Sequence, residues 1–101
     1  MKYLVVDDSK LARLSLIKSL NIHINDEVIY QVANGLEAVE FMSNEKIDVV
    51  FLDLTLPIMN GYEALPKLLE INPKAKIIVV SADIQTKAQE RVIYHLGHYS
   101  M

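Results

Sequence analysis

Four short runs of apolar, mostly β-branched residues recur along this chain, and they constrain its fold more than any other feature. The runs cover residues 3–6, 28–33, 47–52 and 76–81. Three of them are apolar at consecutive positions, which is typical of parallel strands that are covered on both faces. The runs are too short and too branched for core helices, so the sequence predicts four strands rather than an all-helical bundle.

Segments with a helical pattern separate these runs. They cover residues 9–20, the stretch that opens at Asn34-Gly35, residues 61–72 and residues 84–96. Ser9 or Asp8 can cap the first of these helices. Its predicted inward stripe consists of Leu11, Leu14, Ile17 and Leu20. The last segment is predicted as a helix because apolar residues recur there at every fourth position. These residues are Ile84, Ala88, Val92 and Leu96.

This alternation of strands and helices predicts an α/β fold. Right-handed crossovers between parallel strands then produce a doubly wound sheet with helices on both faces. A chain of 101 residues has room for one hydrophobic core, so residues 1–101 are expected to form a single domain.

The composition excludes several classes of function. A formal net charge of −3 provides no electrostatic footprint for nucleic acid or an anionic membrane. The chain has no cysteine, which excludes disulfides, thiolate metal sites and cysteine nucleophiles. The first strand is expected at Tyr3, which leaves no room for a signal peptide. No apolar run approaches the roughly 20 residues of a membrane helix. We therefore expect a cytoplasmic domain without nucleic-acid or membrane partners.

Acidic and hydroxyl side chains stand at the ends of three predicted strands. Asp7 and Asp8 follow the first strand, Asp53 ends the third, and Ser81 ends the fourth. In open α/β sheets the carboxyl ends of the strands form one rim, where ligands bind. Each residue also has a simpler interpretation, since Asp8 can cap a helix, Asp53 can begin a loop and Ser81 can end a strand. Their combination favours a single functional site.

The three predicted carboxylates need a partner, because like charges in one crevice repel one another. Mg²⁺ meets that need, since it binds one or two carboxylates with waters and usually works with phosphate. A carboxylate beside Mg²⁺ can also act as a nucleophile and form an aspartyl phosphate. The hydroxyl of Ser81 could then donate a hydrogen bond to a phosphoryl oxygen.

Three segments around these residues resemble the response-regulator receiver domain, including the single-domain chemotaxis-regulator type. The segments read YLVVDDSKLAR at 3–13, VVFLDLTLPIMNGYEAL at 49–65 and KIIVVSAD at 76–83. The resemblance extends to about Leu96 and implies the flavodoxin-like fold of receivers in two-component signal transduction.

The resemblance implies a role for each residue of the predicted site. Asp53 would be the phosphoacceptor, Asp8 a direct Mg²⁺ ligand, and Asp7 a ligand mainly through a bound water. The main-chain carbonyl of Thr55 would complete the protein ligands, and Ser81 would be the hydroxyl switch that moves toward the phosphoryl group. The donor would be a phosphohistidine on a sensor histidine kinase or a phosphotransfer protein. The output would be binding to a downstream protein, and enzymatic activity would be limited to self-phosphorylation and self-dephosphorylation.

The end of the chain departs from the family pattern. The family continues with a fifth strand, a lysine at its end and a fifth helix, whereas no lysine follows Lys87 here. We therefore predict a receiver domain that lacks the fifth strand and fifth helix and is incomplete at its C-terminus. The bared edge of the fourth strand and an uncovered apolar face then predict a homodimer through the exposed sheet edge.

Two other functions remain open at this point. The missing lysine favours a pseudo-receiver, in which the fold serves association or dimerisation and phosphorylation is impaired, whereas the acidic cluster favours a working phosphoacceptor. A phosphatase that forms an aspartyl phosphate would usually have a second acid two residues after the nucleophile, where this chain has Thr55.

Overall fold

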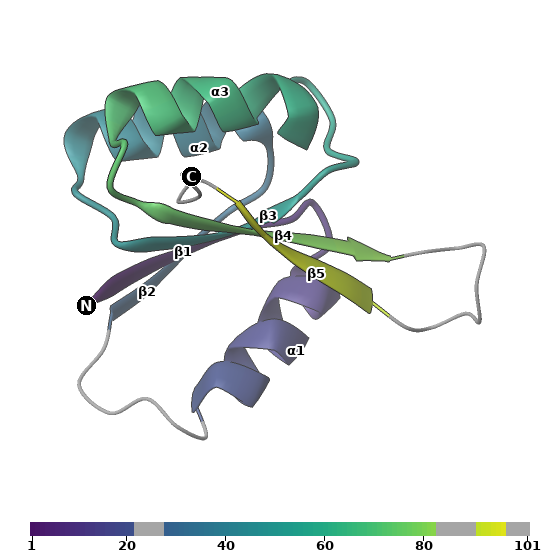
Figure 1. The fold of residues 1–101 in the computed structure, drawn as a ribbon. Helices are drawn as coiled ribbons and strands as arrows, with labels where there is room; N and C mark the ends of the chain where they lie inside the picture. The colour runs from purple at the N-terminus through teal and green to yellow at the C-terminus, as the bar shows by residue number, and fades with distance from the viewer. Residues whose placement is uncertain (22–27, 83–90, 97–101) are drawn as a thin grey trace.

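Four parallel strands form the centre of the fold, and they arise from the four apolar runs (Figure 1). The computed structural model of the chain describes residues 1–21, 28–82 and 91–96. The strands are β1 (Lys2–Val6), β2 (Val28–Val32), β3 (Val49–Asp53) and β4 (Lys76–Ala82). They lie in the order β2-β1-β3-β4, with a fifth strand next to β4. The predicted doubly wound α/β fold is therefore confirmed.

The two central strands, β1 and β3, are buried on both faces. Leu4, Val5 and Val6 of β1 are at most 1% exposed, and Val50 and Leu52 of β3 are fully buried. Consecutive residues of a strand point to opposite faces, so burial at consecutive positions requires cover on both sides. This is the arrangement that the uninterrupted apolar runs predict.

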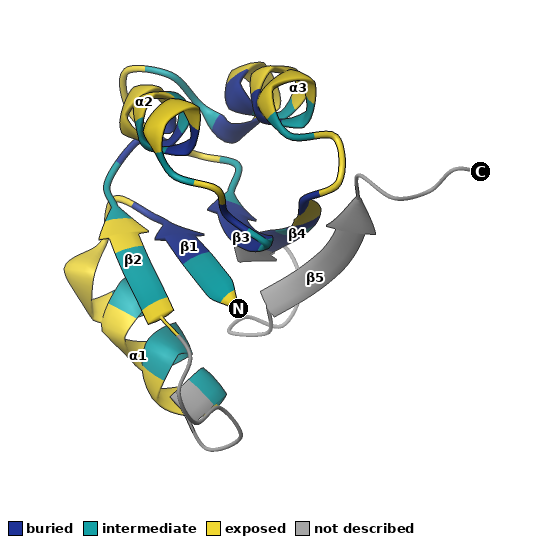
Figure 2. Cartoon of the chain, turned by 90° about the vertical axis from the view of Figure 1, so that its left-hand side faces the viewer, coloured by how far each residue is buried: buried dark blue, intermediate teal, exposed yellow. Residues whose placement is uncertain are grey.

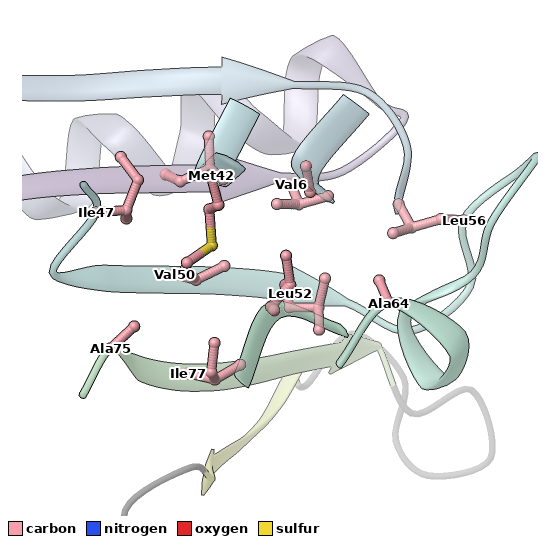
Figure 3. Packing of buried hydrophobic residues seen from close by; sticks show 12 residues of the cluster. Val6, Met42, Ile47, Val50, Leu52, Leu56, Ala64, Ala75 and Ile77 are labelled. Carbon is pink, nitrogen blue, oxygen red and sulfur yellow. The ribbon is translucent and has the colours of Figure 1, made fainter. Parts of the chain in front are cut away.

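Helices cover the sheet on both sides (Figures 1 and 2). They are α1 (Lys10–Asn21), α2 (Gly35–Asn44) and α3 (Gly61–Ile71). α2 and α3 lie on one face, and the main hydrophobic core combines their buried residues with those of the sheet. Figure 3 shows how the side chains of this core pack. This core consists of Leu4, Val6, Ala38, Met42, Ile47, Val50, Leu52, Leu56, Ala64, Leu68, Ala75 and Ile77. α1 lies on the other face, where Val5, Val49, Phe51 and Val80 form a smaller buried cluster.

Side-chain caps define where α2 and α3 begin. The side chain of Asn34 accepts a hydrogen bond from the backbone N–H of Glu37 at 2.8 Å. Asn60 and Glu63 form a reciprocal capping box at the start of α3. Both caps satisfy backbone donors that have no partner within the first helical turn. Since each helix starts beside the carboxyl end of a strand, the caps also fix the loops at that edge of the sheet.

The inward stripe of α1 differs from the predicted one. Leu11 is 79% exposed and Leu14 is 44% exposed, whereas Leu16, Ile17 and Leu20 pack against the sheet. Residues spaced by three along a helix turn through about 300° per step, so their direction drifts by roughly 60° each time. Between Leu11 and Leu20 this drift reaches half a turn, so the predicted set cannot face the sheet together.

Residues 91–96 form a strand, so the prediction of a helix over 84–96 is wrong there. β5 (Arg91–Leu96) runs antiparallel to β4, with Ser81 opposite Val92. Its sequence, RVIYHL, is rich in β-branched and aromatic residues, which suit a strand as well as a helical period. Pairing with the open edge of β4 favours the strand over the helix. The connection between β4 and β5 is too short for a parallel crossover, so β5 runs antiparallel. Residues 83–90, the rest of the predicted helix, lie outside the described residues.

This strand also removes the basis of the predicted homodimer. We expected a receiver without a fifth strand, with the edge of β4 bare, but β5 pairs with that edge. We also expected an uncovered apolar face, yet Val49, Phe51 and Val80 on the α1 side are at most 8% exposed. The predicted homodimer required a bare β4 edge and an exposed apolar face, and the described residues show neither.

Two leucines in helices provide a test of this core. Leu68 of α3 is fully buried and Leu11 of α1 is 79% exposed. We expect Leu68→Ala to lower the free energy of unfolding by about 2–5 kcal/mol, because it removes buried methyl groups and leaves a cavity. Leu11→Ala should change it by about 0.5 kcal/mol or less. Urea unfolding followed by circular dichroism measures both, and equal effects would contradict the assignment of the two helix faces.

Candidate functional site

Three carboxylates meet where β1 and β3 end. Val6 of β1 pairs with Leu52 of β3. Asp7 follows Val6 and Asp53 follows Leu52, so the two acids lie side by side. Asp8 follows directly, and one oxygen from each of the three carboxylates lies within 4.8 Å of the others. The structure therefore brings together the three acids that the sequence predicts at this rim, while the role of each remains a prediction.

The β1–α1 loop directs Asp8 toward this cluster rather than into a helix cap. The hydroxyl of Ser9 accepts a hydrogen bond from the backbone N–H of Ala12 at 3.2 Å, which makes Ser9 the cap of α1. The buried carboxylate of Asp7 accepts a hydrogen bond from the N–H of Ser9 at 3.0 Å. Of the two caps that the sequence allows, the structure uses Ser9, and the exposed carboxylate of Asp8 belongs to the acidic cluster.

The carboxylate of Asp53 is oriented by Thr55. Its Oδ1 accepts hydrogen bonds from the Thr55 backbone N–H at 3.3 Å and from the Thr55 hydroxyl at 3.4 Å. This is the local turn that an Asp adopts when it bonds to the backbone two residues later. The sequence prediction assigned only the main-chain carbonyl of Thr55 to the site and missed its hydroxyl. The signal for it was present, since a hydroxyl residue follows Asp53 at a spacing of two.

Two glycines allow the loop after β3 to pack against its neighbours. A Cβ on Gly61 would lie 2.4 Å from the carbonyl oxygen of Asp53 and 2.7 Å from Cα of Leu54. A Cβ on Gly35 would lie 2.2 Å from the carbonyl oxygen of Met59, which accepts a hydrogen bond from the Gly35 N–H at 2.9 Å. No side chain fits at either position, so the helix starts hold this loop from both sides. The sequence prediction treated both residues only as helix openings.

The same loop contains one unusual backbone conformation. Ile58 has a φ of 66° and is 76% exposed. A β-branched residue in the left-handed region is strained, because its Cβ lies too close to the backbone. The hydrogen bonds of the adjoining residues hold it there, including the one from Met59 N–H to the carbonyl of Pro57 at 2.6 Å. The loop beside Asp53 is therefore held in one conformation by its neighbours.

Ser81 belongs to the same rim as far as its backbone is described. Val80 of β4 pairs with Asp53 of β3, so Ser81 lies one residue beyond the end of that pairing. The structure describes the backbone of Ser81 and not its side chain. Lys87, which the sequence prediction placed in a helix away from the site, lies outside the described residues.

The acidic cluster matches the needs of a hard divalent cation. Mg²⁺ binds oxygen ligands at about 2.1 Å, so two oxygens on opposite sides of the ion lie roughly 4.2 Å apart. The oxygens of Asp7, Asp8 and Asp53 lie within 4.8 Å of one another, so small side-chain movements would bring them to one ion. Such an ion would also neutralise their mutual repulsion.

Comparison with known proteins agrees with this geometry. The family model for the response regulator receiver domain matches residues 3–99. The chemotaxis protein CheY of Listeria monocytogenes is 42% identical over 82 residues, which cover 81% of this chain and 68% of the relative. The chain therefore belongs to the response regulator receiver family. Receiver domains of this kind bind Mg²⁺ at an acidic pocket and act in two-component signalling.

Longer relatives and solved structures match as well. A protein-glutamate methylesterase/protein-glutamine glutaminase of Rhodospirillum centenum is 37% identical over 93 residues, which are 86% of this chain and only 24% of that protein. The response regulator domain of CheB from Thermotoga maritima superposes with a TM-score of 0.70 at 33% identity, covering 88% of this chain and 66% of that one. A chain of the CheX-CheY-BeF3-Mg²⁺ complex from Borrelia burgdorferi superposes with a TM-score of 0.74 at 31% identity, covering 85% of this chain and 65% of that one.

Within the part of the chain that the structure describes, no helix has the length and apolar character needed to cross a membrane.

The packing of Gly61 leads to a direct test of how the site is held. Alanine near a helix start is ordinarily favourable, because it restricts the unfolded chain. At Gly61 we expect the opposite, a loss of about 1–3 kcal/mol in the free energy of unfolding, because the new methyl group overlaps the backbone of Asp53 and Leu54. Gly35→Ala should behave in the same way through Met59. Chemical denaturation measures both, and an increase in stability for either variant would contradict the close approach.

Proposed function

We propose that this chain acts as a single receiver domain that accepts a phosphoryl group on Asp53. The donor is a phosphohistidine on a sensor histidine kinase or a phosphotransfer protein, the kinds of protein with which receiver domains interact. The convergence of the Asp7, Asp8 and Asp53 carboxylates at the carboxyl end of the sheet supports this proposal most strongly. A domain that served only association would have no need to bring three like charges together.

The proposed transfer is a displacement at phosphorus. A carboxylate oxygen of Asp53 attacks the phosphorus of the phosphohistidine as the P–N bond breaks, and the imidazole nitrogen keeps that electron pair and takes up a proton. The product is an acyl phosphate on Asp53. Thr55 contributes by orienting the carboxylate through Oδ1. The glycine contacts keep the loop from moving as charge accumulates on the transferred group.

Side chains and one carbonyl of this chain would hold the metal. Asp8 and Asp53 would bind it directly, Asp7 mainly through a water, and Thr55 through its main-chain carbonyl. When bound, Mg²⁺ offsets the negative charge of the acids and of the phosphoryl oxygens during transfer. The burial of Asp7 and the exposure of Asp8 support this division, because the more accessible carboxylate can approach an incoming ion most freely.

The signal would then pass to a downstream protein. In this proposal the hydroxyl of Ser81 is the switch that moves toward the phosphoryl group on Asp53. The domain would work in the cytoplasm, where two-component phosphotransfer partners act. The methylesterase relatives extend far beyond the matched residues, so their activity forms no part of the proposal. Homodimerisation through the edge of β4 is not proposed either, since β5 occupies that edge.

Phosphorylation of Asp53 can be measured by intact mass. Incubation with Mg²⁺ and a small-molecule acyl phosphate donor should add the mass of one phosphoryl group to the parent chain. Asp53→Asn should gain nothing, because the amide is not a nucleophile under these conditions. Glu70→Gln, at the exposed far end of α3, is a control that retains all three acids of the cluster and should be labelled like the parent. Equal labelling of Asp53→Asn, or no labelling of a folded parent chain, would contradict the proposal, and the second result would favour the pseudo-receiver.

The metal requirement provides a separate test. We expect labelling to stop when Mg²⁺ is chelated and to return when it is restored. Calorimetric titration with MgCl₂ should give an affinity at least about tenfold weaker for Asp8→Asn, because a direct ligand is lost. Asp7→Asn should have a smaller effect, since its ligation passes through water. Labelling that is independent of Mg²⁺ would exclude this role for the acidic cluster.

A further inference from the structure

Arg13 of α1 links the acidic loop to the edge strand β2. Its Nη1 donates a hydrogen bond to the main-chain carbonyl of Asp7 at 2.6 Å, and its Nε donates one to Oε1 of Gln31 at 2.9 Å. One guanidinium group therefore contacts the β1–α1 loop and β2 at the same time. None of the site predictions from the sequence includes Arg13 or Gln31.

The bond to the Asp7 carbonyl restrains the peptide unit that leads into Asp8. That oxygen belongs to the peptide unit between Asp7 and Asp8, and a peptide unit is planar. The N–H of Asp7 donates to the carbonyl of Val32 at 3.2 Å, and its carboxylate accepts from the N–H of Ser9 at 3.0 Å. With its carbonyl held by Arg13 as well, Asp7 is restrained at both ends and at its side chain. The orientation of the peptide plane between Asp7 and Asp8 is thereby restrained.

Gln31 supplies the partner that orients the guanidinium. It lies opposite Val5 in the parallel register, on the face of the sheet that α1 covers. Gln31 is the polar residue in a strand that otherwise reads Val-Ile-Tyr-Val. Arginine donates here from two different nitrogens of a rigid planar group, whereas lysine has its three donors on one nitrogen and cannot reproduce both contacts with this geometry. The contact therefore depends on the shape of the group as well as on its charge.

The charge and the position of Arg13 act on cation binding in opposite directions. A permanent positive charge near the acidic cluster repels a divalent ion, but Arg13 is partly exposed, so solvent and salt screen that repulsion. The short bond to the Asp7 carbonyl is charge-assisted, and such bonds are the stronger kind. We therefore expect restraint of the loop to be the larger effect.

We propose that Arg13, oriented by Gln31, is a positioning residue that sets the affinity of the acidic cluster for Mg²⁺. It holds the Asp7–Asp8 peptide so that both carboxylates face Asp53. This inference rests on the metal site of the proposed function.

Calorimetric titration with MgCl₂ alone, on chains shown to be folded, tests the inference. Arg13→Lys keeps the charge and loses the fork, so we expect its Mg²⁺ dissociation constant to rise about tenfold, the lower end of the range for residues that support metal ligands. Gln31→Met keeps the length of the side chain and should weaken binding in the same direction. Gln31→Glu keeps an acceptor for Nε and should bind at least as tightly as the parent. Lys18→Gln removes a positive charge from the last turn of α1 and should leave the affinity within twofold.

The outcomes separate this inference from the proposed function. If the parent chain does not bind Mg²⁺, the metal site of the proposed function fails, and the inference fails with it. If the parent binds but Arg13→Lys and Gln31→Met bind equally well, the inference alone is overturned. The rate of Asp53 labelling adds a second criterion, because a positioning role predicts that saturating Mg²⁺ restores the rate of Gln31→Met. A rate that stays low at saturation would also overturn the inference.

Discussion

The repulsion among three carboxylates is the constraint on which the rest of this structure depends. Parallel pairing of β1 with β3 places Asp7 and Asp53 at adjacent strand ends, and Asp8 follows in the same loop. If the three acids were on flexible loops, the loops would move and increase the distance between the charges. Here the strand ends cannot separate, because β1 and β3 lie in the fully buried centre of the sheet. The core therefore holds together three carboxylates whose mutual repulsion a bound cation would reduce.

Backbone contacts around the acids keep this arrangement in place. Gly35 and Gly61 bring two helix starts against the loop after β3, and their hydrogen bonds restrain it from both sides. Thr55 orients Asp53, while Ser9 and Arg13 restrain the loop that carries Asp7 and Asp8. Functional groups held by rigid elements lose little freedom when a ligand binds. The three carboxylates are thus held close together by their neighbours before any ligand binds.

The last described strand shows how a local pattern can mislead. Val92 and Leu96 fit a helical stripe, yet residues 91–96 pair with β4 as a strand. The spacing of apolar residues cannot by itself distinguish a helix from a strand in a short apolar segment that also contains β-branched and aromatic residues. The deciding factor was an unpaired strand edge, whose donors and acceptors need partners. The error in α1 was of another kind, because the helix was predicted correctly but leucines at a spacing of three face different directions, and Leu11 is exposed.

The sequence by itself determined the four parallel strands, the three helices that connect them and the three acids at one rim. These features follow from runs of residues and from the rule that parallel strands end at the same edge. Tertiary structure decided the rest, because it depends on contacts between segments far apart in the chain. Only the folded chain shows that β5 pairs with the edge of β4, that Gly35 contacts Met59, and that Arg13 contacts both Asp7 and Gln31.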